Sequence, residues 1–256
     1  RHRSLRATFN YSWQRLDKDQ QQILRALSVF RGGFSRQAAY MIAGANLTSI
    51  TSLLDRSLLQ RQVDGRIKMH RMIQHFAEEK LKESPAIWDQ VHEKHSHYFA
   101  GFLLEREGDL DNENMVSVRE EVRREIENLR KAIDWVVTHW ETIDALEVVR
   151  AYFSFYLVQG WQKGAPAFNR ITSLIQNEKK SSHLDDPVYL SSQAHRGWFL
   201  SNLGLIEESE TISQKCLQPL QKHGLDREAS LCLHNLGVNA EFRGEYQLSR
   251  ISVSYT

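Results

Sequence analysis

The hydrophobic period of the chain changes between residues 58 and 69, and this change constrains the fold more than any other feature. Residues 58–63 (LLQRQV) and 66–69 (RIKM) have the pattern of short β-strands. Asp64-Gly65 between them tolerates the positive φ angles of a tight hairpin turn. Residues 69–81 then return to helical spacing. We therefore expect a hairpin that leads directly into a helix.

Helices are expected before this hairpin. Residues 3–16 have helical spacing, and Asp17 with Gln20 predicts a capping box that opens a second helix. That helix is expected to bury residues up to Phe30 and to end at Gly32-Gly33. Ser35 is expected to cap a third helix, and a fourth should run from about Thr48 to Leu58. Helices followed by one hairpin indicate a winged-helix domain, expected over residues 1–84, with Pro85 at its end.

Long helices are expected to link this domain to the rest of the chain, over residues 85–140. One apolar stripe runs from Trp88 to Phe102 and includes His95, and a second runs from Met115 to Trp140 at three- and four-residue steps. The charged run at residues 119–125 is expected to be solvated and mutually paired.

A weak repeat of about forty residues fills residues 141–256. Gly160, Gly204 and Gly244 align, and Gly197 and Gly237 precede the last two by seven residues. Glycines at turns and at close helix crossings are typical of tetratricopeptide-like (TPR-like) helical hairpins, so we expect a right-handed α-superhelix. Asp186-Pro187 and Asp226 are expected to be N-caps. The pattern stops within residues 249–256 and residue 1 is not Met, so we expect a fragment truncated at both ends, with the repeats cut short at the C-terminus.

Composition excludes several classes of protein. Lys and Arg total 33 against 32 acidic residues, so a global basic field for nucleic acid is absent. The sequence lacks a long apolar stretch and a signal-peptide core, so we expect a cytoplasmic protein without membrane contact. Cys216 and Cys232 fall in helical patterns, where they are expected to be reduced, small apolar residues.

Catalytic signatures are also absent from the sequence. It contains no phosphate-binding Gly-x-x-x-x-Gly-Lys-Ser/Thr loop, no Gly-x-Ser-x-Gly elbow and no Cys-x-x-Cys pair. We therefore expect that this chain is not an enzyme and binds no cofactor or metal by itself. His92 and His95 have an i, i+3 spacing, but a third ligand is lacking, so we expect surface or half-buried rings.

Two sets of residues are candidates for binding. His70 and Arg71 lie where the strand meets the helix N-terminus, and unpaired N–H groups there attract phosphates. The alternative is that His70 only caps the helix or packs under the hairpin. In the repeats, the register places a possible partner groove at Arg150, Ser154, Trp198, Ser201, His234 and Glu241. Trp198 could instead belong to the core between repeats.

Several motifs in order resemble the NB-ARC/STAND signalling ATPases of bacteria. They are residues 1–7 (RHRSLRA), 27–34 (LSVFRGGF), 53–59 (LLDRSLL), 69–71 (MHR) and 127–135 (ENLRKAIDW). The resemblance implies an N-terminal P-loop domain, absent from this chain, that binds ADP or ATP with Mg²⁺. It also implies that His70 contacts the phosphates of ADP and that the repeats bind a protein or small-molecule effector. Arg71 stands where the family has aspartate.

The sequence also allows two other functions. The repeats could be a scaffold for protein–protein interaction without nucleotide coupling. The winged helix could belong to a DNA-binding transcriptional regulator, although the helix before the hairpin offers only Arg56 beside Asp55 to recognise bases. Direct DNA binding is therefore not the expectation from sequence.

Overall fold

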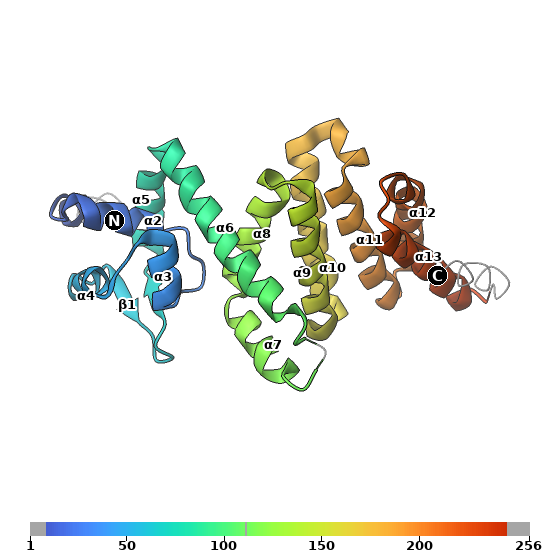
Figure 1. Ribbon diagram of the computed structural model, residues 1–256, viewed down its shortest axis with the longest axis horizontal. Helices are drawn as coiled ribbons and strands as arrows, with labels where there is room; N and C mark the ends of the chain where they lie inside the picture. The colour runs from blue at the N-terminus through green and yellow to red at the C-terminus, as the bar shows by residue number, and fades with distance from the viewer. Residues whose placement is uncertain (1–8, 111, 245–256) are drawn as a thin grey trace. The chain divides into compact units, whose positions relative to one another are not determined.

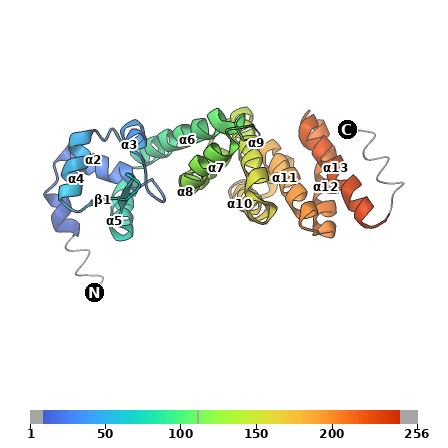
Figure 2. The ribbon, with the colours of Figure 1, turned by 90° about the horizontal axis from the view of Figure 1, so that it is seen from below.

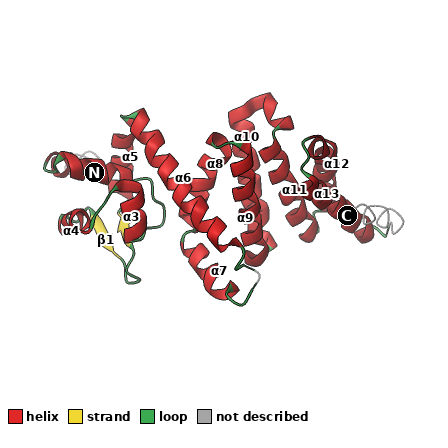
Figure 3. Ribbon diagram, viewed as in Figure 1, coloured by secondary structure: helices red, strands yellow, loops and turns green. Residues whose placement is uncertain are grey.

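The computed structural model describes residues 9–110 and 112–244. This part of the chain is mainly helical with one two-stranded hairpin, as the sequence predicts (Figure 3). It divides into two compact units, and helices α6, α7 and α8 contribute residues to both. Unit 1 contains the described residues up to 102 together with residues 123–132, and unit 2 contains residues 103–122 and those from 133 onward. The motif at residues 1–7 and the expected chain end at residues 249–256 lie outside the described residues.

The described part of unit 1 starts with a helical segment at residues 9–14 and continues through short helices to the hairpin (Figure 1). Its elements are α2 (Lys18–Leu27), α3 (Arg36–Ala43), α4 (Leu47–Asp55), β1 (Leu59–Arg61), β2 (Ile67–Met69), α5 (Arg71–Lys82), most of α6 (Pro85–Glu107) and the start of α8 (Ile126–His139).

The caps expected at Asp17 and Ser35 are confirmed, whereas the expected helix start at residue 3 lies outside the described residues. Two expected helix ends are wrong, because α4 ends at Asp55, before the expected Leu58, and α2 also ends early. Gln20 N–H donates to Asp17 over 2.8 Å, and Ala38 N–H donates to Ser35 Oγ over 3.1 Å. However, α2 ends at Leu27, well before Gly32-Gly33. The apolar pattern of the sequence continues past the end of α2 because the loop that follows is also buried. In this loop Phe30 stacks on Phe34, with their ring centroids 4.5 Å apart.

The hairpin has the predicted turn and gains an additional partner. Leu59 pairs with Met69 and Arg61 with Ile67, and Gly65 in the turn has a φ of +81°. On the other edge of β2, Ile67 exchanges two backbone hydrogen bonds with Phe34, 2.8 and 2.9 Å long. The buried loop at residue 34 therefore occupies the position of a third strand.

Helix α6 buries two histidines in the core of unit 1. His95 is 1% exposed and lies in the apolar stripe as predicted, with its ring 4.7 Å from Phe99 and 5.6 Å from Phe30. His92 is 3% exposed, so the burial of both rings contradicts the expected surface or half-buried positions. Its Nδ1 lies 2.9 Å from the Trp88 carbonyl, so a backbone contact accompanies its burial.

From α9 onward, unit 2 is a succession of helices in which each packs on the next (Figure 2). Its elements are the end of α6, α7 (Met115–Arg124) up to residue 122, the rest of α8, α9 (Thr142–Gln159), α10 (Trp161–Lys179), η1 (Lys180–Asp185), α11 (Pro187–Asn202), α12 (Ile206–Lys222) and α13 (Asp226–Phe242). Helix α11 packs against α9, α10, α12 and α13.

Two of the aligned glycines have the expected roles in unit 2. Gly204 lies between α11 and α12 with a φ of +77°, a conformation that other residues rarely adopt. Gly197 lies at a close helix crossing, where a Cβ would be 3.3 Å from the Asn235 side chain. The turn and the crossing are therefore both set by the absence of a side chain.

Buried polar side chains join α11, α12 and α13. Ser201 donates to Asn239 over 2.6 Å, Asn239 donates to Ser209 over 3.1 Å, and Ser209 donates to the Gly197 carbonyl over 2.8 Å. All of these side chains are buried. We call Ser201, Asn239 and Ser209 the polar ladder of unit 2.

One of the two N-caps predicted in unit 2 is confirmed. Tyr189 N–H donates to Asp186 over 2.9 Å, with Pro187 as the first helical residue. Asp226 is instead the first residue of α13, after Leu225 at the cap position. Leu225 is 9% exposed, so burial of its side chain fixes the start of the helix one residue earlier than expected.

None of the described helices is both long and apolar enough to cross a membrane. Cys216 and Cys232 are buried free thiols, as predicted. Burial raises the pKa of Cys216 to about 12, so this thiol stays protonated at neutral pH.

We predict that acid destabilises unit 1 through its buried histidines. Burial lowers the pKa of His92 from 6.5 to about 4 and that of His95 to about 3. Between pH 6.5 and 4 the unfolded chain therefore binds more protons than the folded chain, and stability falls as pH falls. At pH 4 the protonation of His92 lowers the free energy of unfolding by about 3 kcal/mol relative to neutral pH.

Urea unfolding followed from pH 7 to pH 4 measures this loss. The variant His92→Leu should flatten the pH dependence, whereas replacing the exposed His234 with Gln should leave it unchanged. Equal pH dependence in the wild type and His92→Leu would show that burial of His92 does not cause the loss of stability in acid.

Candidate functional site

His70 lies at the N-terminus of α5 with an exposed ring. Its backbone is extended, with φ −62° and ψ 137°, and its Nδ1 accepts a hydrogen bond from Met72 N–H over 3.3 Å. Arg71 is the first residue of α5 and is also exposed. His70 therefore caps the helix and is not packed under the hairpin, so its ring is accessible to another molecule or module.

The hairpin that precedes His70 carries three cations with different surroundings. Arg61 and Lys68 are exposed. Arg66 is turned inward, with its side chain only 14% exposed. Its Nη2 donates to the Gly33 carbonyl over 2.9 Å. The hairpin thus presents two of its basic side chains to solvent and buries the third.

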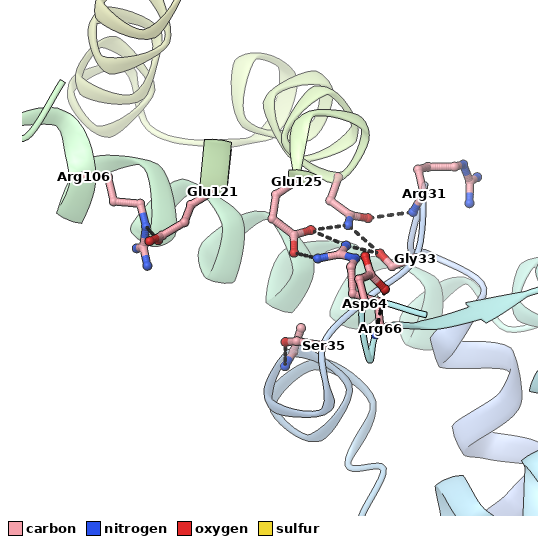
Figure 4. Close-up of polar contacts among 10 residues, drawn as sticks. Arg31, Gly33, Ser35, Asp64, Arg66, Arg106, Glu121 and Glu125 are labelled. Carbon is pink, nitrogen blue, oxygen red and sulfur yellow. Dashed lines mark hydrogen bonds and ion pairs between the residues drawn. The ribbon is translucent and has the colours of Figure 1, made fainter. Parts of the chain in front are cut away.

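Glu125 is the partner of Arg66 and lies at a break between α7 and α8 (Figure 4). Its two oxygens accept from both terminal nitrogens of Arg66, and the Nη2 to Oε2 distance is 2.9 Å. The hydrogen bond to Glu125 raises the pKa of Arg66, although burial acts in the opposite direction. The prediction that residues 119–125 are solvated is wrong at Glu125, which is 8% exposed.

Asn128, one turn later in α8, joins the same contacts and is fully buried. Its Nδ2 donates to Glu125 over 2.7 Å and to the Gly33 carbonyl over 2.9 Å. Its Oδ1 accepts from the Arg31 backbone N–H over 2.6 Å. We call Arg31, Gly33, Arg66, Glu125 and Asn128 the interlock.

Helix α5 holds the other side of the same loop. Gln74 donates to the Ser28 carbonyl over 3.2 Å and also to the Phe30 carbonyl. Glu78 pairs with the Arg31 guanidinium over 3.0 Å. The helix that begins at His70 is therefore connected to the interlock through the loop at residues 28–33.

The interlock brings together two sequence motifs that are almost a hundred residues apart. Arg31 and Gly33 belong to the segment LSVFRGGF, and Asn128 belongs to ENLRKAIDW. Sequence reasoning singled out both motifs but did not predict that they touch. The available signal was an asparagine in an apolar stripe, because a buried amide needs several hydrogen-bond partners.

In unit 2, Arg150 of the expected groove forms an ion pair across helices. Its Nε donates to Glu228 Oε1 over 2.6 Å and its Nη2 to Oε2 over 3.0 Å, joining α9 to α13. Ser191 of α11 also donates to Glu228, over 3.2 Å. Burial alone would raise the pKa of Glu228, but Arg150 outweighs this effect and holds the pKa below its usual value.

The other expected groove residues differ in their exposure. Ser154 is half-buried and donates to Glu107 over 2.9 Å, whereas His234 and Glu241 are exposed. Ser201 is 1% exposed and belongs to the polar ladder, so it is not available to a ligand. Trp198 is half-buried, and its ring lies 5.6 Å from that of Phe153 and 6.3 Å from that of Trp161. Trp198 thus combines core contacts with a partly exposed edge.

One apolar surface of unit 1 was not predicted. Tyr40, Met41 and Leu47 are 62%, 58% and 59% exposed where α3 meets α4, and Tyr40 and Leu47 line an open hollow there. Elsewhere, the described residues contain no group of three His, Cys, Asp or Glu side chains that could hold a metal ion.

The chain is similar to three curated bacterial proteins, each named "Putative HTH-type transcriptional regulator". Two are from Mycobacterium tuberculosis, strains H37Rv and CDC 1551, and one is from Mycobacterium bovis. Each is 29% identical over 160 residues, which make up 58% of this chain and 18% of the relative. The chain thus matches about a fifth of the length of these relatives. Their names describe these relatives as transcriptional regulators.

No family model matches the chain, and no solved structure matches it.

We predict that Asn128→Ala destabilises the protein by about 2–3 kcal/mol, because the buried Arg31 N–H loses its acceptor and Glu125 loses a donor. Urea unfolding measures this change. The control Asn169→Ala removes an amide from the exposed face of α10 and should cost less than about 0.5 kcal/mol. Equal costs for the two variants would show that the interlock does not stabilise unit 1.

Proposed function

We propose that this chain is a regulatory segment of a transcriptional regulator. In this proposal, unit 1 contains a winged-helix module that contacts the DNA backbone, and α9–α13 are TPR-like repeats that bind a protein or small-molecule effector. The similarity to named HTH-type regulators is the observation that carries the regulatory role.

The order of elements in unit 1 supports a winged helix. Helix α2 is followed by the strand-like position at Phe34, then by α3, α4 and the β1–β2 hairpin. The Phe34–Ile67 bridge places this position beside β2, which gives the small sheet three members. In such a module the β1–β2 hairpin is the wing, and α4 is the helix that precedes it.

The side chains of this module favour phosphate contacts over base recognition. Helix α4 exposes Thr48 and Thr51 and carries no basic residue. The hairpin exposes Arg61 and Lys68, which can neutralise phosphates without recognising sequence. The proposed contact is therefore weak, salt-dependent and largely independent of sequence. This differs from the sequence-based expectation, because the relatives favour a DNA-binding regulator.

The helices of unit 2 support the repeat assignment. The α9–α10 and α11–α12 pairs each turn at a glycine of positive φ, Gly160 and Gly204. Helices α9, α11 and α13, the first helix of each successive pair, are connected by the Arg150–Glu228 ion pair and Ser191. In TPR-like arrays these first helices line the binding groove, so the exposed His234 and Glu241 of α13 remain groove candidates.

We predict that Lys68→Ala and Arg61→Ala weaken binding of the chain to a short DNA duplex. Each lost phosphate contact should reduce the slope of log K against log salt by about 0.9. Fluorescence anisotropy across a salt series measures both the affinity and the slope. Lys215→Ala removes an exposed cation from α12 as a control and should bind like the wild type. Wild-type binding by both hairpin variants would contradict the proposal.

A second candidate function is nucleotide sensing, favoured by the exposed His70 at the start of α5. In this reading the parent protein carries a P-loop domain that holds ADP or ATP with Mg²⁺, and His70 contacts the phosphates. Arg71 beside it supplies a cation to the same place. The names of the relatives support the first candidate more than this one.

For nucleotide sensing, we predict that His70→Ala in the intact parent protein weakens ADP retention roughly tenfold, the loss of one hydrogen bond to a charged group. Isothermal titration with ADP measures the change. His75→Ala, an exposed histidine on the same helix, is the matched control. Equal ADP retention by His70→Ala and the wild type would exclude His70 as a sensor.

A further inference from the structure

The wing hairpin holds one cation out of solvent. Arg61 and Lys68 are exposed, whereas the Arg66 guanidinium is almost covered and is bonded to Glu125 and to the Gly33 carbonyl. The geometry with Glu125 is two-pronged, with both terminal nitrogens of Arg66 on one carboxylate. A phosphate presents the same spacing of oxygens to a guanidinium. A carboxylate and a phosphate therefore compete for the same donors of Arg66.

Glu125 costs free energy to bury, and that cost needs compensation. Its side chain is 11% exposed, and both oxygens are used by Arg66 and Asn128. Removing a carboxylate from water is expensive, and an apolar pair of similar volume often stabilises a core as well or better. A gain in stability therefore explains the Arg66–Glu125 pair poorly. Control of the availability of the Arg66 guanidinium explains it better.

The position of Glu125 in the chain suits a releasable contact. It is the single residue between the end of α7 at Arg124 and the start of α8 at Ile126. A side chain at such a corner changes its position when either helix shifts, whereas a residue within a continuous helix is held by the turns on both sides. The rest of the hairpin is held independently, by the pairing of β1 with β2 and of Ile67 with Phe34.

We propose that Glu125 is an autoinhibitory residue that masks Arg66, and that movement of the α7–α8 corner frees this guanidinium to bind a nucleic-acid phosphate. The inference rests on the proposed function of the hairpin as a DNA contact. Asn128 positions the mask, because its Nδ2 holds the Glu125 carboxylate while its Oδ1 fixes the loop at Arg31. In the masked state only Arg61 and Lys68 of the hairpin are available to DNA.

Fluorescence anisotropy of the full chain with a short duplex, over a salt series, tests this mask. Glu125→Gln removes the charge, and Glu125→Asp keeps the charge but shortens the side chain so that it no longer reaches both nitrogens. Both variants should bind DNA more tightly than the wild type, and the salt slope should become steeper by about 0.9, the value for one further phosphate contact. Circular dichroism melts establish that the variants are folded.

Two controls separate the mask from a general change in charge. Glu121→Gln removes a carboxylate one turn earlier in α7, where it pairs with Arg106, and should leave DNA binding unchanged (Figure 4). The double variant Arg66→Ala with Glu125→Gln should return to the wild-type affinity and slope, because the freed cation is gone.

A third measurement, mass spectrometry after phenylglyoxal treatment, reports the accessibility of Arg66 without DNA. Arg66 should be protected in the wild type and modified in Glu125→Asp, while Arg61 is modified in both. Equal protection of Arg66 in these two proteins would overturn the mask.

The outcomes distinguish the mask from the proposed function. If the wild type binds DNA through Lys68 and the Glu125 variants bind no more tightly, the mask is wrong and the DNA contact stands. If the Glu125 variants expose Arg66 to phenylglyoxal yet no variant binds DNA, the mask stands as a contact but the proposed function, and with it autoinhibition of DNA binding, is wrong.

Discussion

The buried amide of Asn128 is the contact on which the arrangement of unit 1 depends. It satisfies a backbone donor at Arg31 and a backbone acceptor at Gly33, and it also holds the Glu125 carboxylate. Without it, the loop between α2 and α3 would expose polar backbone groups to an apolar core that contains Phe30 and Phe34. Through this loop, α5 and α8 contact one common element, although they are far apart in the sequence.

The local structure of the chain was predictable where a few neighbouring residues determine it. The capping box at Asp17, the cap at Ser35 and the Asp64-Gly65 turn each depend on contacts within four residues. The predictions failed where distant packing decides. Glu125 lies in a charged run that is typical of a solvated face, but Arg66 reaches it from the hairpin. Likewise, the burial of Leu225, not the chemistry of Asp226, sets the start of α13.

The candidate site was predictable only in part, for the same reason. A strand that ends in a helix places His70 at a helix N-terminus, and the structure has it there with an exposed ring. The interlock depends on contacts across more than fifty residues, which a single sequence does not reveal. The repeat register placed Arg150 among groove residues, but it could not indicate that Glu228 would occupy its guanidinium. The number of charged side chains in a sequence is therefore an upper bound on the number that can contact a partner, because some of them are paired within the fold.

The polar ladder of unit 2 bears on how such an array can evolve. Apolar helix faces tolerate sliding, because dispersion contacts depend little on direction, whereas hydroxyl and amide groups bond only at set distances and angles. Ser201, Asn239 and Ser209 therefore fix the phase between successive helix pairs. Duplication or loss of a helix pair would preserve the stacking only if the copied segment restored this spacing of hydroxyl and amide groups. Insertions at the glycine turns, which carry no ladder residue, would be accommodated more easily.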